Sequence, residues 1–133
     1  MRSKITVIDA PGVSERLAEG DYADVVGPDE MPGSDVVVLG PGADAAAGAR
    51  RAASRAPGAA VIVIEGDVRA AMEASYLPRG RVFGVGEHDL EAAVEAVALD
   101  RRATVTVELV GLDGSLVTVP VSLGAGGVRE LRG

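Results

Sequence analysis

Four short runs of apolar residues constrain the possible folds of this chain most strongly. They occupy residues 5–8, 35–39, 60–64 and 81–85 and lack the regular alternation of apolar and polar positions. Strands with this pattern are buried on both faces, as in a parallel sheet that has helices on each side. The stretch YADVV at residues 22–26 is a weaker fifth candidate. The runs therefore predict an α/β protein with a parallel sheet of about five strands.

Helical segments lie between these runs. Residues 12–19 form barely two turns before Gly20, a residue type that commonly follows a helix. Residues 43–56 are rich in Ala and Arg, which favour helices. The third segment is amphipathic, and its spacing predicts one shared face made of Val68, Ala71, Met72, Ser75 and Tyr76.

The pattern changes after Gly86. Residues 89–100 have the spacing of an amphipathic helix. Residues 103–110 and 116–123 then alternate around an Asp-Gly pair, which predicts a β-hairpin. Residues 127–131 can add a third antiparallel strand.

The element order predicts the fold class. We expect a Rossmann-like doubly wound parallel sheet followed by a small C-terminal antiparallel sheet. Residues 1–86 form the first unit and residues 87–133 the second, and the two are expected to pack as one domain. A chain of 133 residues is long enough to bury a sizeable core.

Composition limits the classes of partner. The formal net charge of −7 argues against binding to nucleic acid or to anionic membranes. The chain contains no cysteine, so disulfides and thiolate chemistry are excluded. No apolar stretch approaches the length of a membrane span, and no signal peptide is visible. We therefore expect a cytoplasmic protein.

Several stretches resemble the NAD-dependent malate and lactate dehydrogenases in family order. KITVI, ERLAEGDYADVV and GSDVVVLGPGA resemble the first, second and fourth strands of that family with their flanks. The stretch at residues 56–86 resembles the fifth and sixth strands and the helix between them. Residues 90–128 resemble the late helix and the C-terminal sheet, and VTVPVSLGAGGV is the most specific part. The resemblance covers most of the chain.

Relative to that family the chain is shortened. The first helix lacks about one turn, and the third strand, the middle of the substrate domain and the final helix are missing. Loss of the third strand changes the family order 3-2-1-4-5-6 into one like 2-1-3-4-5, which is still a viable open sheet.

The resemblance implies a cofactor site that has degenerated. The family turn G-x-G-x-x-G brings backbone N–H groups to the cofactor pyrophosphate. Here the turn reads DAPGVS, so Asp9 and Pro11 replace the first two glycines and Gly12 follows them. Proline has no N–H, and a carboxylate about 4 Å from phosphate is repelled by roughly 4 kcal/mol. A simpler interpretation is that Asp9 and Pro11 begin a helix.

Three further positions match cofactor contacts of the family. Asp29 matches the acidic residue that binds the adenosine ribose, but the preceding Gly-Pro pair interrupts its strand, so an ordinary loop residue is an alternative. Gly40 and Gly42 keep backbone access in the loop that resembles a cofactor-contacting loop. We regard Asp9, Gly12, Asp29, Gly40 and Gly42 as a vestigial site and expect no cofactor, with NAD only if the turn still binds it.

The catalytic groups that the resemblance implies are not found. The family uses a histidine paired with an aspartate as proton donor, but the loop that should carry it is deleted and His88 sits near a helix start instead. Arg50 and Arg51 are better explained as the solvated face of an Ala-rich helix. The Glu65-Gly66 region replaces a substrate-contacting asparagine. We therefore predict no catalytic residues and no dehydrogenase activity.

The acidic residues suggest no metal site. Glu65, Asp67, Glu87 and Asp89 could gather near the carboxyl ends of strands, but a solvated acidic rim explains them more simply. The sequence has no Cys or His cluster for a transition metal.

Three functions stay open. The first is a non-catalytic binding or assembly module that forms a homo-oligomer or docks onto a full-length dehydrogenase. The others are a residual nucleotide or small-molecule binder, and an NAD-dependent dehydrogenase completed by a partner subunit. The homo-oligomer is expected because the alternating apolar residues of the hairpin need cover: Val105, Val107, Leu109, Val117, Val119 and Val121.

Overall fold

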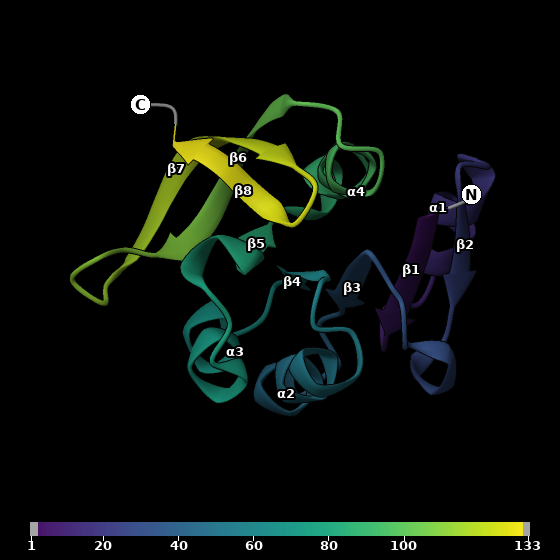
Figure 1. Ribbon diagram of the computed structural model, residues 1–133, viewed down its shortest axis with the longest axis horizontal. Helices are drawn as coiled ribbons and strands as arrows, with labels where there is room; N and C mark the ends of the chain where they lie inside the picture. Colours follow the sequence, from purple (N-terminus) through teal and green to yellow (C-terminus); the bar gives the residue numbers. More distant parts are fainter. Residues whose placement is uncertain (1–2, 132–133) are drawn as a thin grey trace.

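A computed structural model describes residues 3–131, and within them eight strands form one sheet in the order β2-β1-β3-β4-β5-β6-β7-β8 (Figure 1). The strands are β1 (Ser3–Ile8), β2 (Ala23–Val26), β3 (Val36–Leu39), β4 (Ala60–Ile64), β5 (Val82–Val85), β6 (Ala103–Val110), β7 (Leu116–Gly124) and β8 (Gly127–Leu131). The helices are α1 (Val13–Glu19), α2 (Ala45–Arg55), α3 (Val68–Ser75) and α4 (Leu90–Ala98). Three short 3₁₀ turns are η1 (Pro28–Glu30), η2 (Arg79–Arg81) and η3 (Glu87–Asp89).

Strands β1 to β5 form the parallel part of the sheet. Their order β2-β1-β3-β4-β5 is the order that sequence analysis predicts. Every residue of β3 and β4 is buried, which explains why these runs are apolar without alternation. The chain leaves β1 in one direction toward β2 and returns on the other side as β3. The loops after β1 and β3 therefore flank the point where ligands bind in sheets of this class.

The antiparallel strands continue the same sheet. Strand β5 pairs with β6 in antiparallel orientation, with Gly84 opposite Glu108. The β6–β7 hairpin closes with Val110 opposite Leu116, and β8 pairs with β7 across a register shift. The predicted fold class is confirmed, and the structure adds that the two parts share one sheet. The boundary between residues 1–86 and 87–133 stays an interpretation.

Helices cover both faces of the sheet. Helices α2 and α3 pack on one face around Val37, Val61 and Val82. On the other face, α1 and α4 pack against apolar residues of β1, β3, β4 and β5. The same core continues into β6 and β7, so α4 covers parallel and antiparallel strands together.

Tyr76 departs from its expected place. The predicted helical face is confirmed for Val68, Ala71 and Ser75, which are buried. Tyr76 instead follows the last residue of α3 in a left-handed conformation, with φ of 59°, and is 93% exposed. The prediction that it shares the helical face is wrong, because the helix ends before the position that would carry it.

The hairpin has more internal cover than the sequence indicates. Val105, Val107, Leu109 and Val121 are buried, and Val117 and Val119 are half-buried against the same core. Homo-oligomerisation stays a prediction. The need to cover apolar side chains, which was its reason, now applies only to the end of the hairpin near the β6–β7 turn. Among the residues whose burial the structure describes, the large apolar ones that remain exposed are Tyr76, Leu112 and Leu116.

The described residues contain no helix that is both long and apolar enough to cross a membrane. The cytoplasmic location stays a prediction.

Phe83 is the largest fully buried side chain, at the centre of a core made mainly of Val, Ala, Ile and Leu. We expect Phe83→Ala to lower the free energy of unfolding by about 3–5 kcal/mol, because removal of the buried ring loses its apolar contacts and leaves a cavity. Glu73→Ala, at an exposed position of α3, is the control and should change stability by less than about 0.5 kcal/mol. Urea denaturation measures both, and equal effects would contradict this description of the core.

Candidate functional site

The loops after β1 and β3 touch each other at the carboxyl edge of the parallel strands. The Gly40 N–H donates a hydrogen bond to the Ile8 carbonyl at 2.8 Å. A side-chain carbon on Gly40 would collide with the Asp9 carbonyl oxygen, so glycine is required for this approach. A carbon on Gly42 would lie 3.7 Å from Asp9 Cβ, an ordinary contact distance. The structure thus brings together three of the predicted site residues, Asp9, Gly40 and Gly42.

The turn after β1 keeps a left-handed backbone where glycine is common. Asp9 has φ of 50° and Gly12 has φ of 84°. Aspartate is one of the few residues besides glycine that tolerate this region. The interpretation that Asp9 and Pro11 begin the helix is wrong, because α1 begins at Val13 after Gly12 and has no side-chain cap. Asp9 serves the shape of the turn instead.

This turn offers little to a phosphate. Pro11 contributes no N–H, and the exposed Asp9 carries a carboxylate beside it. Helix α1 is seven residues long, so few aligned peptide dipoles stand behind the turn. Compared with a glycine-rich dinucleotide turn, this turn therefore has one N–H fewer and one carboxylate more.

Asp29 is held by a neighbouring helix. Strand β2 ends at Val26, as the Gly-Pro pair predicts, and Asp29 lies in η1 on the next loop. Its carboxylate is fully exposed and forms an ion pair with Arg51 of α2 at 3.6 Å. Arg51 also donates to the Pro28 carbonyl at 3.4 Å, so it joins α2 to η1. The expectation that Arg51 lies on a merely solvated helix face is corrected by these contacts.

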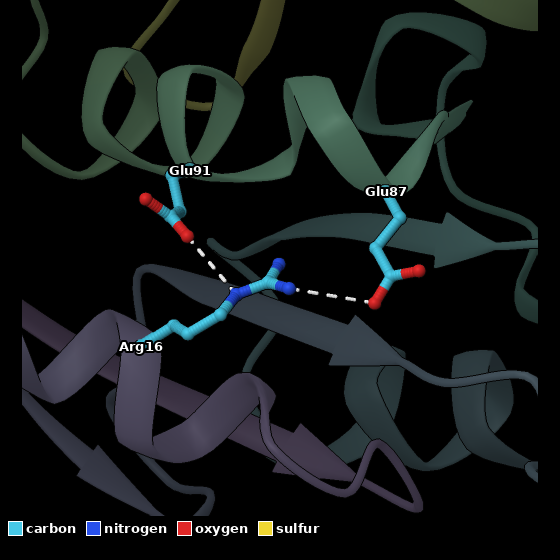
Figure 2. Close-up of polar contacts among 3 residues, drawn as sticks. All are labelled: Arg16, Glu87 and Glu91. Atoms are coloured by element: carbon cyan, nitrogen blue, oxygen red, sulfur yellow. Dashed lines mark hydrogen bonds and ion pairs between the residues drawn. The ribbon is translucent and has the colours of Figure 1, made fainter.

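Arg16 links α1 to the start of α4, as Figure 2 shows. Its Nη1 lies 3.4 Å from Glu87 Oε1, and its Nε lies 3.0 Å from Glu91 Oε1. The Nε atom is buried, and its contact with Glu91 is an ion pair without hydrogen-bond alignment. Because both carboxylates are more than half exposed, the pairs add little stability. They do neutralise the guanidinium, which is therefore not free for an anionic ligand.

His88 lies in η3 at the start of α4, as its place in the sequence predicts. It is 86% exposed, and its Nε2 lies 3.3 Å from Asp89 Oδ2. Both residues line a cleft of about 540 Å³ at the carboxyl ends of β4 and β5, together with Glu65 and Glu108. The cleft thus carries three carboxylates and one imidazole.

The predicted acidic rim forms only in part. Asp67 accepts a hydrogen bond from the Ala70 N–H at 2.9 Å and so caps α3, while Glu87 pairs with Arg16. Sequence analysis missed Glu108, which reaches the cleft because β6 pairs with β5. The alternation of polar and apolar residues along β6 indicated that Glu108 lies on the polar face of a strand. It did not indicate that this strand pairs with β5. Across residues 3–131, no group of three or more His, Asp or Glu side chains is placed to hold a metal ion.

Tyr22 lies between α1 and α4 beside two glutamates. Its burial, together with the nearby charges of Glu95 and Glu91, raises the pKa of the Tyr22 phenol to about 12. Burial is the largest cause, because a phenolate loses hydration there. The phenol thus stays neutral well into the alkaline range.

Comparisons with known proteins find similarity in fold. Neither a protein-family model nor a curated protein sequence matches the chain. Among solved structures, Cryptosporidium parvum malate dehydrogenase matches with a TM-score of 0.81 at 12% identity, covering 99% of this chain and 91% of that chain. Malate dehydrogenase from Salinibacter ruber matches with a TM-score of 0.80 at 16% identity, covering 97% and 88%.

A third solved structure, Cryptosporidium parvum lactate dehydrogenase complexed with lactic acid and nicotinamide adenine dinucleotide, has a TM-score of 0.70 at 14% identity. The match covers 99% of this chain and 90% of that chain. The chain therefore has the fold of the malate and lactate dehydrogenases, as its resemblance to them implies.

The contact between Gly40 and Asp9 generates a first prediction for the site. We expect Gly40→Ala to lower the free energy of unfolding by about 2 kcal/mol or more, because the added methyl group meets backbone that cannot move away. Gly42→Ala is a matched control in the same loop and should change stability by less than about 0.5 kcal/mol. Chemical denaturation of both variants tests this, and a tolerated alanine at position 40 would contradict the close approach of the two loops.

The environment of Tyr22 generates a second prediction. In the folded chain Tyr22 keeps its proton to about pH 12, whereas an unfolded tyrosine loses it near pH 10. The free energy of unfolding should therefore fall by about 1–2 kcal/mol as pH rises through this window, since solvent screening reduces the full effect. Denaturation at several alkaline pH values should show the decline in the natural chain. A decline of equal size in Tyr22→Phe would assign it to other groups.

Proposed function

We propose that this chain is a non-catalytic binding or assembly module built on the malate and lactate dehydrogenase fold. The observation that carries the proposal is the turn at residues 9–12. This turn keeps its left-handed backbone but presents a carboxylate at Asp9 and no N–H at Pro11. A turn of this kind preserves the packing of the β1 and β3 loops and disfavours a phosphate.

The state of the charged side chains supports the proposal. An anionic substrate needs an unpaired guanidinium, but Arg16 faces two glutamates and Arg51 faces Asp29. A proton donor works best when it is held in place away from bulk water. His88 is largely exposed and contacts the residue next to it in the sequence. None of these groups is arranged as the resemblance to a dehydrogenase implies.

The partner in this proposal is a second copy of the chain or a full-length dehydrogenase. The hairpin extends beyond the part of the sheet that α4 covers, and Leu112 and Leu116 near its tip are exposed (Figure 1). A protruding strand pair with exposed apolar side chains is a suitable contact for another protein. This observation favours a chain that binds another protein over one that stays monomeric.

The cleft beside His88 supports a second candidate function, the binding of a small molecule. Its volume of about 540 Å³ is large enough for a metabolite. Its carboxylates, Glu65, Asp89 and Glu108, oppose a phosphate-bearing cofactor and suit a neutral or cationic compound. A screen of small molecules by thermal shift would separate this function from assembly.

The proposal predicts that NAD and NADH at millimolar concentration raise the melting temperature by less than about 1 °C. By linkage, a ligand at 100 times its dissociation constant would add about 2.7 kcal/mol, which corresponds to several degrees. Thermal denaturation with and without the nucleotides measures this. The double variant Asp9→Gly, Pro11→Gly removes the charge and restores an N–H, so it should bind NAD at least about tenfold more tightly than the natural chain.

Two results would overturn the proposal. One is a shift of several degrees in the natural chain, equal to that of the double variant. The other is steady oxidation of NADH with oxaloacetate or pyruvate by the chain alone, surviving removal of contaminating enzymes. Turnover that begins only when a co-purified protein is added would instead support a dehydrogenase completed by a partner subunit.

A further inference from the structure

An apolar groove lies between the end of β6 and β8, beside η2. Its volume is about 350 Å³, and its apolar lining comes from Leu109, Val110, Leu112 and Val128. Of these residues, Leu109 and Val110 are buried, whereas Leu112 is 88% exposed. The groove is separate from the cleft beside His88 and from the β1 and β3 loops.

The position of Leu112 is set by the hairpin. The loop that carries it follows β6, and the Leu112 carbonyl accepts a hydrogen bond from Arg79 Nη2 at 3.5 Å. The loop is tightened by Asp113, whose carboxylate accepts hydrogen bonds from Ser115 N–H at 3.0 Å and Ser115 Oγ at 2.6 Å. Because these hydrogen bonds already restrict the loop, its exposed leucine loses little conformational freedom when it is buried in a protein–protein contact.

Both signs of charge surround the groove. Arg79, Arg129 and Glu130 are among the residues that line it. Asp113 adds a second carboxylate at the hairpin tip, and its hydrogen bonds with Ser115 lower the pKa of this group. Two arginines at one apolar groove are notable in a chain with a net charge of −7.

A symmetric dimer needs a patch that complements itself, because the same residues meet their own copies across the two-fold axis. This patch has an exposed leucine, a groove that can receive one, and charges of both signs at its border. We infer that the groove binds Leu112 of a second copy of the chain, so that the two hairpin tips meet near the two-fold axis. Asp113 and Glu130 of one copy then lie toward Arg79 and Arg129 of the other.

This inference rests on the proposed function, since it names the surface through which the assembly forms. Apolar residues near the centre of an interface contribute most of its stability, and a symmetric dimer contains each of them twice. A charge placed at position 112 would be buried twice in the dimer. We therefore expect Leu112→Asp to raise the dimer dissociation constant about a hundredfold or more.

The matched control is Tyr76→Asp. Tyr76 is 93% exposed and does not line the groove, so this variant also replaces a large exposed apolar residue by a carboxylate. Aspartate tolerates the left-handed backbone at this position. Sedimentation velocity from low to high micromolar concentration gives the association state of the natural chain and of both variants, and circular dichroism verifies that each is folded.

A second measurement uses the absence of cysteine from the chain. Leu112→Cys introduces a single thiol near the inferred axis, and Tyr76→Cys introduces one elsewhere. Under a mild oxidant in dilute solution, the first variant should form a covalent dimer much faster than the second. Gel electrophoresis without reductant measures both rates.

The expected result is a dimer of the natural chain that Tyr76→Asp preserves and Leu112→Asp dissociates, with rapid cross-linking at position 112. A dimer that survives Leu112→Asp would show that this surface is not the dimer interface. It would not contradict the proposed assembly function. A natural chain that is monomeric at high micromolar concentration would overturn self-association altogether. In that case the measurements with NAD and NADH still decide whether the chain is non-catalytic. Equal losses in both aspartate variants would also overturn the inference.

Discussion

Burial of β3 and β4 on both faces is the constraint on which the rest of the structure depends. Strands enclosed in this way need helices that approach closely, and the chain supplies small residues for it. Gly48 of α2 lies so near Leu39 that an added carbon would be 2.6 Å from the leucine side chain. Ala49 and Ala52 continue the same contact surface. The layers therefore form a dense core from small and medium side chains, with Phe83 as its fully buried aromatic ring.

The same packing explains why the loops after β1 and β3 approach each other closely at the carboxyl edge of the sheet. Once β1 and β3 are fixed side by side, the loops that follow them must pass each other at backbone contact. Gly40 is required at this point for steric reasons, independent of any cofactor. Asp9 keeps the left-handed backbone of the turn with a residue that carries charge. The turn therefore combines a left-handed backbone with a side chain that carries charge, a combination that glycine at the same position could not give.

The sequence predicted those parts of the molecule that depend on local pattern. The buried runs, the strand order and the hairpin around Asp113 and Gly114 follow from periodicity, turn residues and the resemblance to the dehydrogenases. The prediction for Tyr76 was wrong because the backbone conformation of a single residue ends the helix. The spacing of apolar residues carries no information about that conformation. Glu108 was missed because its neighbours come from strand pairing across the sheet. The partners of Arg16 and Arg51 likewise depend on how separate elements meet.

The join between β5 and β6 differs from the rest of the sheet in what holds it together. The parallel strands are paired over four residues each, and β6 and β7 are paired over eight, whereas the register between β5 and β6 includes the single pair of Gly84 and Glu108. The core shared with α4, together with the contacts of α3 and η2 with β6 and β8, therefore holds the antiparallel strands to the parallel ones. The two parts of the sheet are thus joined by side-chain packing more than by a long ladder of backbone pairs.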